Sequence, residues 1–117
     1  MSDNSSDILD ELFSVLKDRK RNPPENSYTS KLYSGGEEKI CEKITEEAGE
    51  LVEAAFESPS PESTKHLVHE AADLWFHTMV LMVHKGVSLD DIRSELGRRF
   101  GISGLDEKAS RQQSQSD

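Results

Sequence analysis

The most informative segment of this chain is residues 43–51, with the sequence KITEEAGEL, because charged side chains stand there where a helix would need apolar ones. A helix over residues 40–55 gathers apolar side chains on one face at 3.6-residue spacing. These side chains are Ile40, Ile44, Leu51 and Ala55. Glu47 projects along the middle of this face, and Glu50 lies at its border beside Lys43. A carboxylate that points into a core costs several kcal/mol unless another group compensates it, so we expect Glu47 to have a partner.

A second acidic pair, Glu70 and Asp73, follows further along the chain. Residues i and i+3 share a helix face, so Glu47 and Glu50 project together, as do Glu70 and Asp73. If the two helices pack antiparallel, four carboxylates face one another, and like charges so close cannot all stay ionised. Mg²⁺ would remove the conflict because it prefers oxygen ligands, and Mn²⁺ would suit the same set. The spacing therefore predicts a divalent-cation site between helices, with Glu46 ordering a neighbouring group or deprotonating a water molecule.

A solvated acidic helix face is the alternative interpretation of these carboxylates. This alternative stays open for Glu46, which points further toward the polar side of the helix than Glu47 does. It does not explain why Glu47 interrupts an apolar stripe. We therefore favour the cation site for the two acidic pairs taken together.

Length and charge bound the remaining possibilities. The chain of 117 residues predicts a single domain over residues 1–111, followed by a polar tail over residues 112–117 that we expect to be disordered. The net charge of −9 argues against a nucleic-acid partner, and the apolar runs are too short for a membrane span. The polar N-terminus does not resemble a signal peptide, and the single Cys41 cannot form an internal disulfide. These features predict a cytoplasmic protein.

Helix signals predict an all-α fold, an antiparallel bundle of four to five helices. The expected helices run from about residue 7 to 21, 35 to 57, 61 to 85 and 89 to 100. A hydroxyl-rich connector is expected over residues 27–34, and a capping box at residues 34–37 should open the second helix. Residues 74–83 of the third helix are apolar nearly all round, so we expect a partner subunit to cover the remaining face. A homodimer is therefore predicted.

Basic residues are the candidates for holding an anionic substrate. In an acidic chain, such a ligand needs divalent cations or a local basic cluster, and arginine forks match phosphate oxygens well. The candidates are Lys31, Lys43, Arg98, Arg99, Lys108 and Arg111. For each of them, an ordinary surface charge remains the open alternative.

The acidic pattern resembles a known signature. EExxE at residues 46–50 followed by ExxD at residues 70–73 resembles the metal-binding motif of the all-α nucleoside triphosphate pyrophosphohydrolases, the MazG-like group. Three flanking segments, at residues 27–33, 73–77 and 98–111, are similar to the phosphoribosyl-ATP pyrophosphohydrolase family within that group. One departure is a threonine before the paired glutamates, where the family pattern has glycine.

The resemblance implies hydrolysis of phosphoribosyl-ATP to phosphoribosyl-AMP and pyrophosphate, the second step of histidine biosynthesis, with Mg²⁺ and in a cytoplasmic homodimer. It implies Glu47, Glu50, Glu70 and Asp73 as metal ligands, Glu46 and Glu47 as catalytic residues, and the six basic candidates as substrate contacts. Two alternatives stay open. One is a house-cleaning (d)NTP pyrophosphatase of the same group, and the other is a non-catalytic helical dimerisation module.

Overall fold

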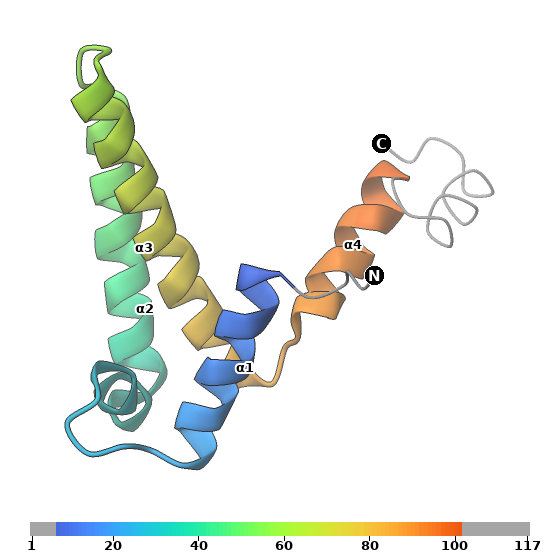
Figure 1. The fold of residues 1–117 in the computed structure, drawn as a ribbon. Coiled ribbons are helices and arrows are strands. Elements are labelled where there is room, and N and C mark those ends of the chain that lie inside the picture. The colour runs from blue at the N-terminus through green and yellow to red at the C-terminus, as the bar shows by residue number, and fades with distance from the viewer. Residues whose placement is uncertain (1–6, 102–117) are drawn as a thin grey trace. The chain divides into compact units, whose positions relative to one another are not determined.

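The computed structural model describes residues 7–101, and these residues form helices joined by short turns (Figure 1). The helices are α1 (Ile8–Arg21), α2 (Tyr28–Ala55), α3 (Pro61–Lys85) and α4 (Leu89–Phe100). No strand occurs within residues 7–101, so the prediction of an all-α fold is confirmed. None of the helices in this part of the chain is long and apolar enough to span a lipid bilayer.

The chain divides into two compact units, Met1–Gly86 and Val87–Asp117. In the first unit, α2 and α3 lie side by side and run in opposite directions, and α1 packs against both (Figure 1). The described part of the second unit contains α4. The predicted antiparallel helical bundle is therefore confirmed for the first unit, where a short turn joins the two helices that carry the acidic pairs.

Helix boundaries follow the capping residues that the sequence predicts. The side chain of Ser60 caps α3, Pro61 takes its first position, and Gly86 ends it with a left-handed φ of 77°. Asp7 and Ser88 cap α1 and α4 in the same way, each through a reciprocal capping box. Local chemistry thus fixes where these three helices begin.

The start of α2 is where the prediction is wrong. Residues 27–34 are helical and not a connector, because Ser27 caps α2, which begins at the following residue. The predicted opening at residues 34–37 coincides instead with a kink inside α2, where Gly36 is not helical. Thr29 and Leu32 are buried, with 3% and 0% of their surfaces exposed. The burial of this segment against the rest of the unit overrides the weak helix propensity of its serine and threonine residues.

Gly36 bends α2 shortly after its start. Its φ of 76° and ψ of −171° fall in a region that is essentially reserved for glycine. Just beyond the bend, Lys85 Nζ donates a hydrogen bond to Glu37 Oε1 at 3.0 Å, and this contact holds the pKa of Glu37 below its ordinary value. The bend therefore separates a short first segment of α2 from the long segment that carries the acidic motif.

The core of the first unit lies where its three helices meet. Its buried apolar side chains are Phe13, Leu16, Leu32, Ile40, Ala54, Met79, Val80 and Val83. Full burial of a large aliphatic side chain contributes about 1.5–3 kcal/mol, so this small set supplies most of the apolar stabilisation of the unit. A polar contact crosses the same region, because Tyr33 Oη donates a hydrogen bond to the Leu16 carbonyl at 3.0 Å.

Several large apolar side chains of the α2–α3 hairpin remain exposed. Trp75 on α3 is 58% exposed, while Val52 and Phe56 at the end of α2 are 56% and 85% exposed. Neighbouring Met79 and Val80 are buried, so residues 74–83 are covered on one side only. The exposed side agrees with the expectation that a partner covers it, and the homodimer itself stays a prediction.

Replacement of Gly36 and of Gly49 in α2 by alanine should change the free energy of unfolding in opposite directions. A Cβ at either Gly36 or Gly49 meets nothing within 4 Å, so the backbone conformation alone determines the effect of the substitution on stability. Gly36→Ala should lower the free energy of unfolding by about 1–3 kcal/mol, because its backbone region excludes alanine. Gly49→Ala should raise it by about 0.5–1 kcal/mol, because alanine is favoured inside a helix. Urea unfolding measures both values, and a loss at Gly49 as large as that at Gly36 would contradict the bend.

Ionisation of Tyr33 should lower the free energy of unfolding at alkaline pH. Burial raises the pKa of Tyr33 to about 12, above its ordinary value of 10.0. A raised folded-state pKa means that its contribution is complete below pH 10 and is lost as pH rises through about 12. Tyr33→Phe should cost about 1 kcal/mol at pH 8, from the lost hydrogen bond to Leu16. Urea unfolding at a series of pH values should show this difference shrinking above pH 10; a constant difference would contradict the assignment.

Candidate metal centre

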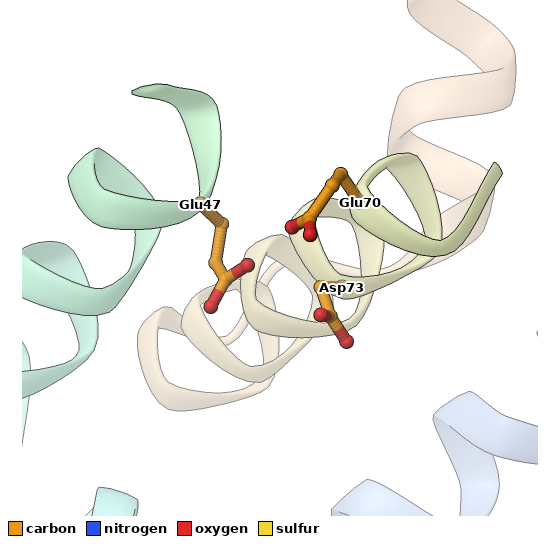
Figure 2. A group of neighbouring side chains, drawn as sticks. All are labelled: Glu47, Glu70 and Asp73. Atoms are coloured by element: carbon orange, nitrogen blue, oxygen red, sulfur yellow. The ribbon is translucent and has the colours of Figure 1, made fainter. Parts of the chain in front are cut away.

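Three carboxylates from two helices meet in the α2–α3 hairpin (Figure 2). Glu47 projects from α2, and Glu70 and Asp73 project from α3 one helical turn apart. One oxygen from each lies within 4.8 Å of the others. Glu47 and Glu70 are buried and Asp73 is half-buried. The structure therefore brings together three of the four residues that the acidic spacing predicts as ligands.

Two oxygens of this cluster lack a compensating contact. Glu47 Oε1 and Glu70 Oε1 are buried and have no hydrogen-bond partner among the described residues. Buried polar atoms without partners are costly, and buried carboxylates more so. A hard divalent cation bound by oxygens would satisfy both atoms and the mutual repulsion, so the residues present fit Mg²⁺ or Mn²⁺.

Glu50, the fourth predicted ligand, lies at the edge of this group and is exposed. The negative charge of Glu47, followed by contacts with Glu70, raises the pKa of the Glu50 carboxyl above its ordinary value. Such a shift is what crowded carboxylates produce in the absence of a counter-charge. Glu50 is therefore beside the cluster without being one of the three tightly grouped side chains.

Glu46 faces the polar side of α2, as its position in the sequence predicts. Lys43 Nζ donates a hydrogen bond to Glu46 Oε1 at 3.0 Å, and this contact raises the pKa of Lys43. The carboxylate of Glu47 acts on Lys43 in the same direction. The structure thus places the ammonium group of Lys43 and the exposed carboxylate of Glu46 beside the buried carboxylate cluster.

Two histidines contact the carboxylates from one turn earlier on α3, and the sequence analysis does not identify them. His66 Nε2 lies 3.1 Å from Glu70 Oε2, and His69 Nε2 lies 3.3 Å from Asp73 Oδ2. Both pairs have i, i+4 spacing, at which side chains on a helix are neighbours. That spacing is visible in the sequence and would have indicated both contacts.

A tyrosine and a buried histidine form a second arrangement that the sequence analysis does not identify. His77 Nδ1 lies 2.9 Å from the Asp73 carbonyl, and His77 Nε2 lies 2.8 Å from Tyr28 Oη. A carbonyl only accepts, so Nδ1 carries a proton, and in the neutral ring Nε2 accepts from the tyrosine hydroxyl. Burial raises the pKa of Tyr28, and the carboxylates of Glu47 and Glu46 add to the shift. Tyr28 therefore belongs to the surroundings of the cluster.

The six basic candidates fall into three groups. Lys43 lies beside the cluster, and Lys31 is exposed on the first segment of α2. Arg98 and Arg99 belong to α4 in the second unit, where both donate to Glu95 Oε2, at 2.7 and 2.8 Å. Lys108 and Arg111 lie outside the described residues. Substrate contact stays a prediction for all six.

Comparison with known proteins gives a consistent result. A family model described as phosphoribosyl-ATP pyrophosphohydrolase matches residues 9–100. A Hydrogenovibrio crunogenus protein named phosphoribosyl-ATP pyrophosphatase is 49% identical over 107 residues, which cover 92% of this chain and 95% of that protein. Proteins of the same name from Rhodopirellula baltica and an Azoarcus species are 52% and 45% identical, covering 88% and 90% of this chain and 85% and 94% of their own lengths. The range matched by the family model, residues 9–100, spans the positions of both acidic pairs.

Divalent cations should stabilise the parent protein through Glu47. A cation at roughly one hundred times its dissociation constant adds about 2.7 kcal/mol to the free energy of unfolding. Glu47→Gln removes one buried charge, so this variant should be at least as stable as the parent in EDTA and should lose most of the gain from Mg²⁺ or Mn²⁺. Thermal unfolding with and without the cation measures both effects. Glu42→Gln on the exposed side of α2 is the control, and an equal cation effect in Glu47→Gln would contradict the site.

Proposed function

The chain belongs to the phosphoribosyl-ATP pyrophosphohydrolase family, and on that basis we propose that it hydrolyses phosphoribosyl-ATP to phosphoribosyl-AMP and pyrophosphate, the second step of histidine biosynthesis. The observation that carries the chemistry is a pair of buried oxygens of the carboxylate cluster, Glu47 Oε1 and Glu70 Oε1, which have no hydrogen-bond partner within residues 7–101. A protein retains such a costly arrangement when a ligand compensates it.

The cofactor of this reaction is Mg²⁺, for which Mn²⁺ can substitute. Glu47, Glu70 and Asp73 would hold it, and Glu50 would complete the ligand set from the edge of the cluster. When bound, the cation supplies electrostatic stabilisation of the pyrophosphate group and polarisation of its phosphoryl oxygens. The exposed position of Glu50 leaves the solvent side of the cluster open to a substrate.

Glu46 and Lys43 lie on that open side. Glu46 has a carboxylate oxygen that can accept a proton from the attacking water, and its hydrogen bond with Lys43 at 3.0 Å fixes its orientation. Glu47, with one oxygen in the cluster, serves as ligand and so orients the reacting groups. Lys43 places its positive charge where the polyphosphate would lie. Substrate contact by Lys31, Arg98, Arg99, Lys108 and Arg111 stays a prediction from the sequence.

We place the active protein in a cytoplasmic homodimer. The support for the dimer is the exposed apolar surface of the hairpin, which includes Val52, Phe56 and Trp75. Contact with a second chain would remove these side chains from water. The proposed domain runs over residues 1–111, followed by the tail at residues 112–117. A nucleic-acid partner does not suit a chain with a net charge of −9.

The proposed reaction predicts a specific pattern of activity. With Mg²⁺, the purified chain should release pyrophosphate from phosphoribosyl-ATP in preference to dCTP, dUTP and ATP. The double variant Glu47→Gln, Asp73→Asn should lose about a hundredfold or more of kcat/KM, because it neutralises two of the proposed ligands. Circular dichroism and sedimentation of the double variant should match those of the parent.

Other outcomes of this assay point to the other functions. Preference for dCTP or dUTP over phosphoribosyl-ATP would replace the pathway assignment by a house-cleaning (d)NTP pyrophosphatase. An intact dimer without Mg²⁺-dependent hydrolysis of any nucleotide would indicate a helical dimerisation module. Full activity of the double variant would contradict the proposed ligands.

A further inference from the structure

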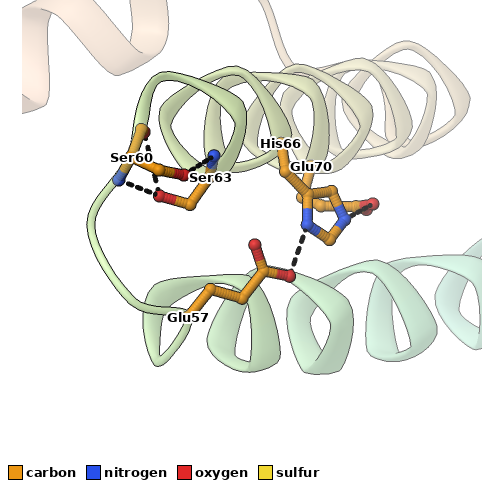
Figure 3. Close-up of polar contacts among 5 residues, drawn as sticks. All are labelled: Glu57, Ser60, Ser63, His66 and Glu70. Atoms are coloured by element: carbon orange, nitrogen blue, oxygen red, sulfur yellow. Dashed lines mark hydrogen bonds and ion pairs between the residues drawn. The ribbon is translucent and has the colours of Figure 1, made fainter.

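The turn between α2 and α3 carries a series of polar contacts that ends at Glu70, a member of the carboxylate cluster (Figure 3). His66 Nδ1 lies 2.7 Å from Glu57 Oε2, and His66 Nε2 lies 3.1 Å from Glu70 Oε2. Glu57 belongs to the turn, two residues beyond the end of α2, whereas His66 and Glu70 are on α3. The imidazole thus bridges the end of one helix and a buried carboxylate of the next.

The two partners of His66 determine which of its ring nitrogens donate hydrogen bonds. Both are carboxylate oxygens, which accept hydrogen bonds, so the ring donates from both nitrogens when it makes both contacts. Glu57 supplies a negative charge beside the ring, so the Glu57–His66 pair is neutral as a unit when the ring is protonated. It can direct Glu70 without adding net charge to the cluster.

The two oxygens of Glu70 are unequal because of this contact. Oε2 is engaged by His66, whereas Oε1 is buried without a partner among the described residues and belongs to a side chain of the three-carboxylate group. A carboxylate that could rotate freely would exchange the two oxygens. The hydrogen bond from His66 removes this freedom, since rotation would break it.

The turn itself is held in place by its own contacts. Ser60 Oγ accepts a hydrogen bond from the Ser63 N–H, and Ser63 Oγ accepts one from the Ser60 N–H, each at 2.9 Å (Figure 3). This reciprocal capping box starts α3 and fixes the direction in which the chain enters the helix. It therefore sets the position of Glu57 relative to His66, one helical turn into α3.

We propose that Glu57 and His66 are positioning residues for the divalent cation: together they hold Glu70 so that it offers Oε1 and keeps Oε2 engaged. This inference rests on the proposed function, because it assumes that Glu70 is a cation ligand. Glu57 acts only through His66, since its contact is with the imidazole. Neither residue touches the reacting atoms.

His69 provides the matched comparison within the same helix. It contacts Asp73 with the same i, i+4 spacing, but at 3.3 Å and with a side chain that is 68% exposed, against 43% for His66. Asp73 is itself half-buried, whereas Glu70 is buried. A contact between exposed groups competes with water and constrains its partner less. His69 should therefore matter less for cation binding than His66.

The test measures Mn²⁺ affinity of the full chain by isothermal titration calorimetry, without substrate and at one fixed pH. His66→Ala should weaken binding about tenfold or more, the range known for groups that orient metal ligands. Glu57→Ala should weaken it less, because Glu57 acts on Glu70 only through the imidazole. The double variant should bind about as weakly as His66→Ala alone, because Glu57 acts through the imidazole. His69→Ala and Glu53→Ala, on the exposed side of α2, should each change affinity by less than about threefold.

The sign of the His66→Ala effect separates positioning from charge. Loss of a positively charged ring beside the carboxylates would by charge alone strengthen Mn²⁺ binding, whereas loss of positioning weakens it. Circular dichroism of the metal-free variants shows whether each has folded. If His66→Ala does not fold, Glu57→Ala, a change in an exposed turn, still tests the proposal. Affinity of His66→Ala equal to or above the parent's, or losses that multiply in the double variant, would overturn the proposal.

Failure of the proposed function gives a different result. If the parent binds no Mn²⁺, both the positioning inference and the proposed ligand set fall. If the parent binds Mn²⁺ and His66→Ala weakens it, but phosphoribosyl-ATP is not hydrolysed, the positioning inference stands and the proposed substrate falls.

Discussion

Repulsion between Glu47 on α2 and Glu70 on α3 is the constraint on which the arrangement of this protein depends. Both side chains are buried, and each has one oxygen without a partner among the described residues. Two like charges in such surroundings oppose the packing of the very helices that carry them. The hairpin must therefore be stabilised elsewhere, and a bound cation would turn the repulsion into an attraction shared by both helices.

The apolar core of the first unit offsets this local cost. Leu32, Ile40 and Val80 are fully buried, and they link both segments of α2 to α3. Proteins commonly carry such a locally unfavourable group at a functional site and compensate for it through packing at a distance. The contacts of His66 with Glu57 and Glu70 and of His77 with Tyr28 then orient the polar groups around the cluster without neutralising its carboxylates.

Much of this arrangement follows from sequence because it is determined locally. Caps such as Ser60 and Gly86 act within one helical turn, and the i, i+3 spacing of each acidic pair puts its members on one face. The beginning of α2 and the contact between Tyr28 and His77 depend instead on tertiary packing between segments 49 residues apart. No local sequence pattern indicates such a contact. The contact between His66 and Glu70 is different, because their i, i+4 spacing indicates it directly in the sequence.

We propose that Glu47, Glu70 and Asp73 jointly hold a divalent cation. The most direct test of this proposal is a crystal structure of the chain grown with Mn²⁺, with diffraction data collected at the manganese absorption edge. We expect an anomalous peak within about 2.0–2.4 Å of one oxygen from each of the three carboxylates, the distance range of oxygen ligands to small divalent cations. Absence of a peak between these carboxylates at saturating Mn²⁺, or a peak bound by other side chains, would contradict it.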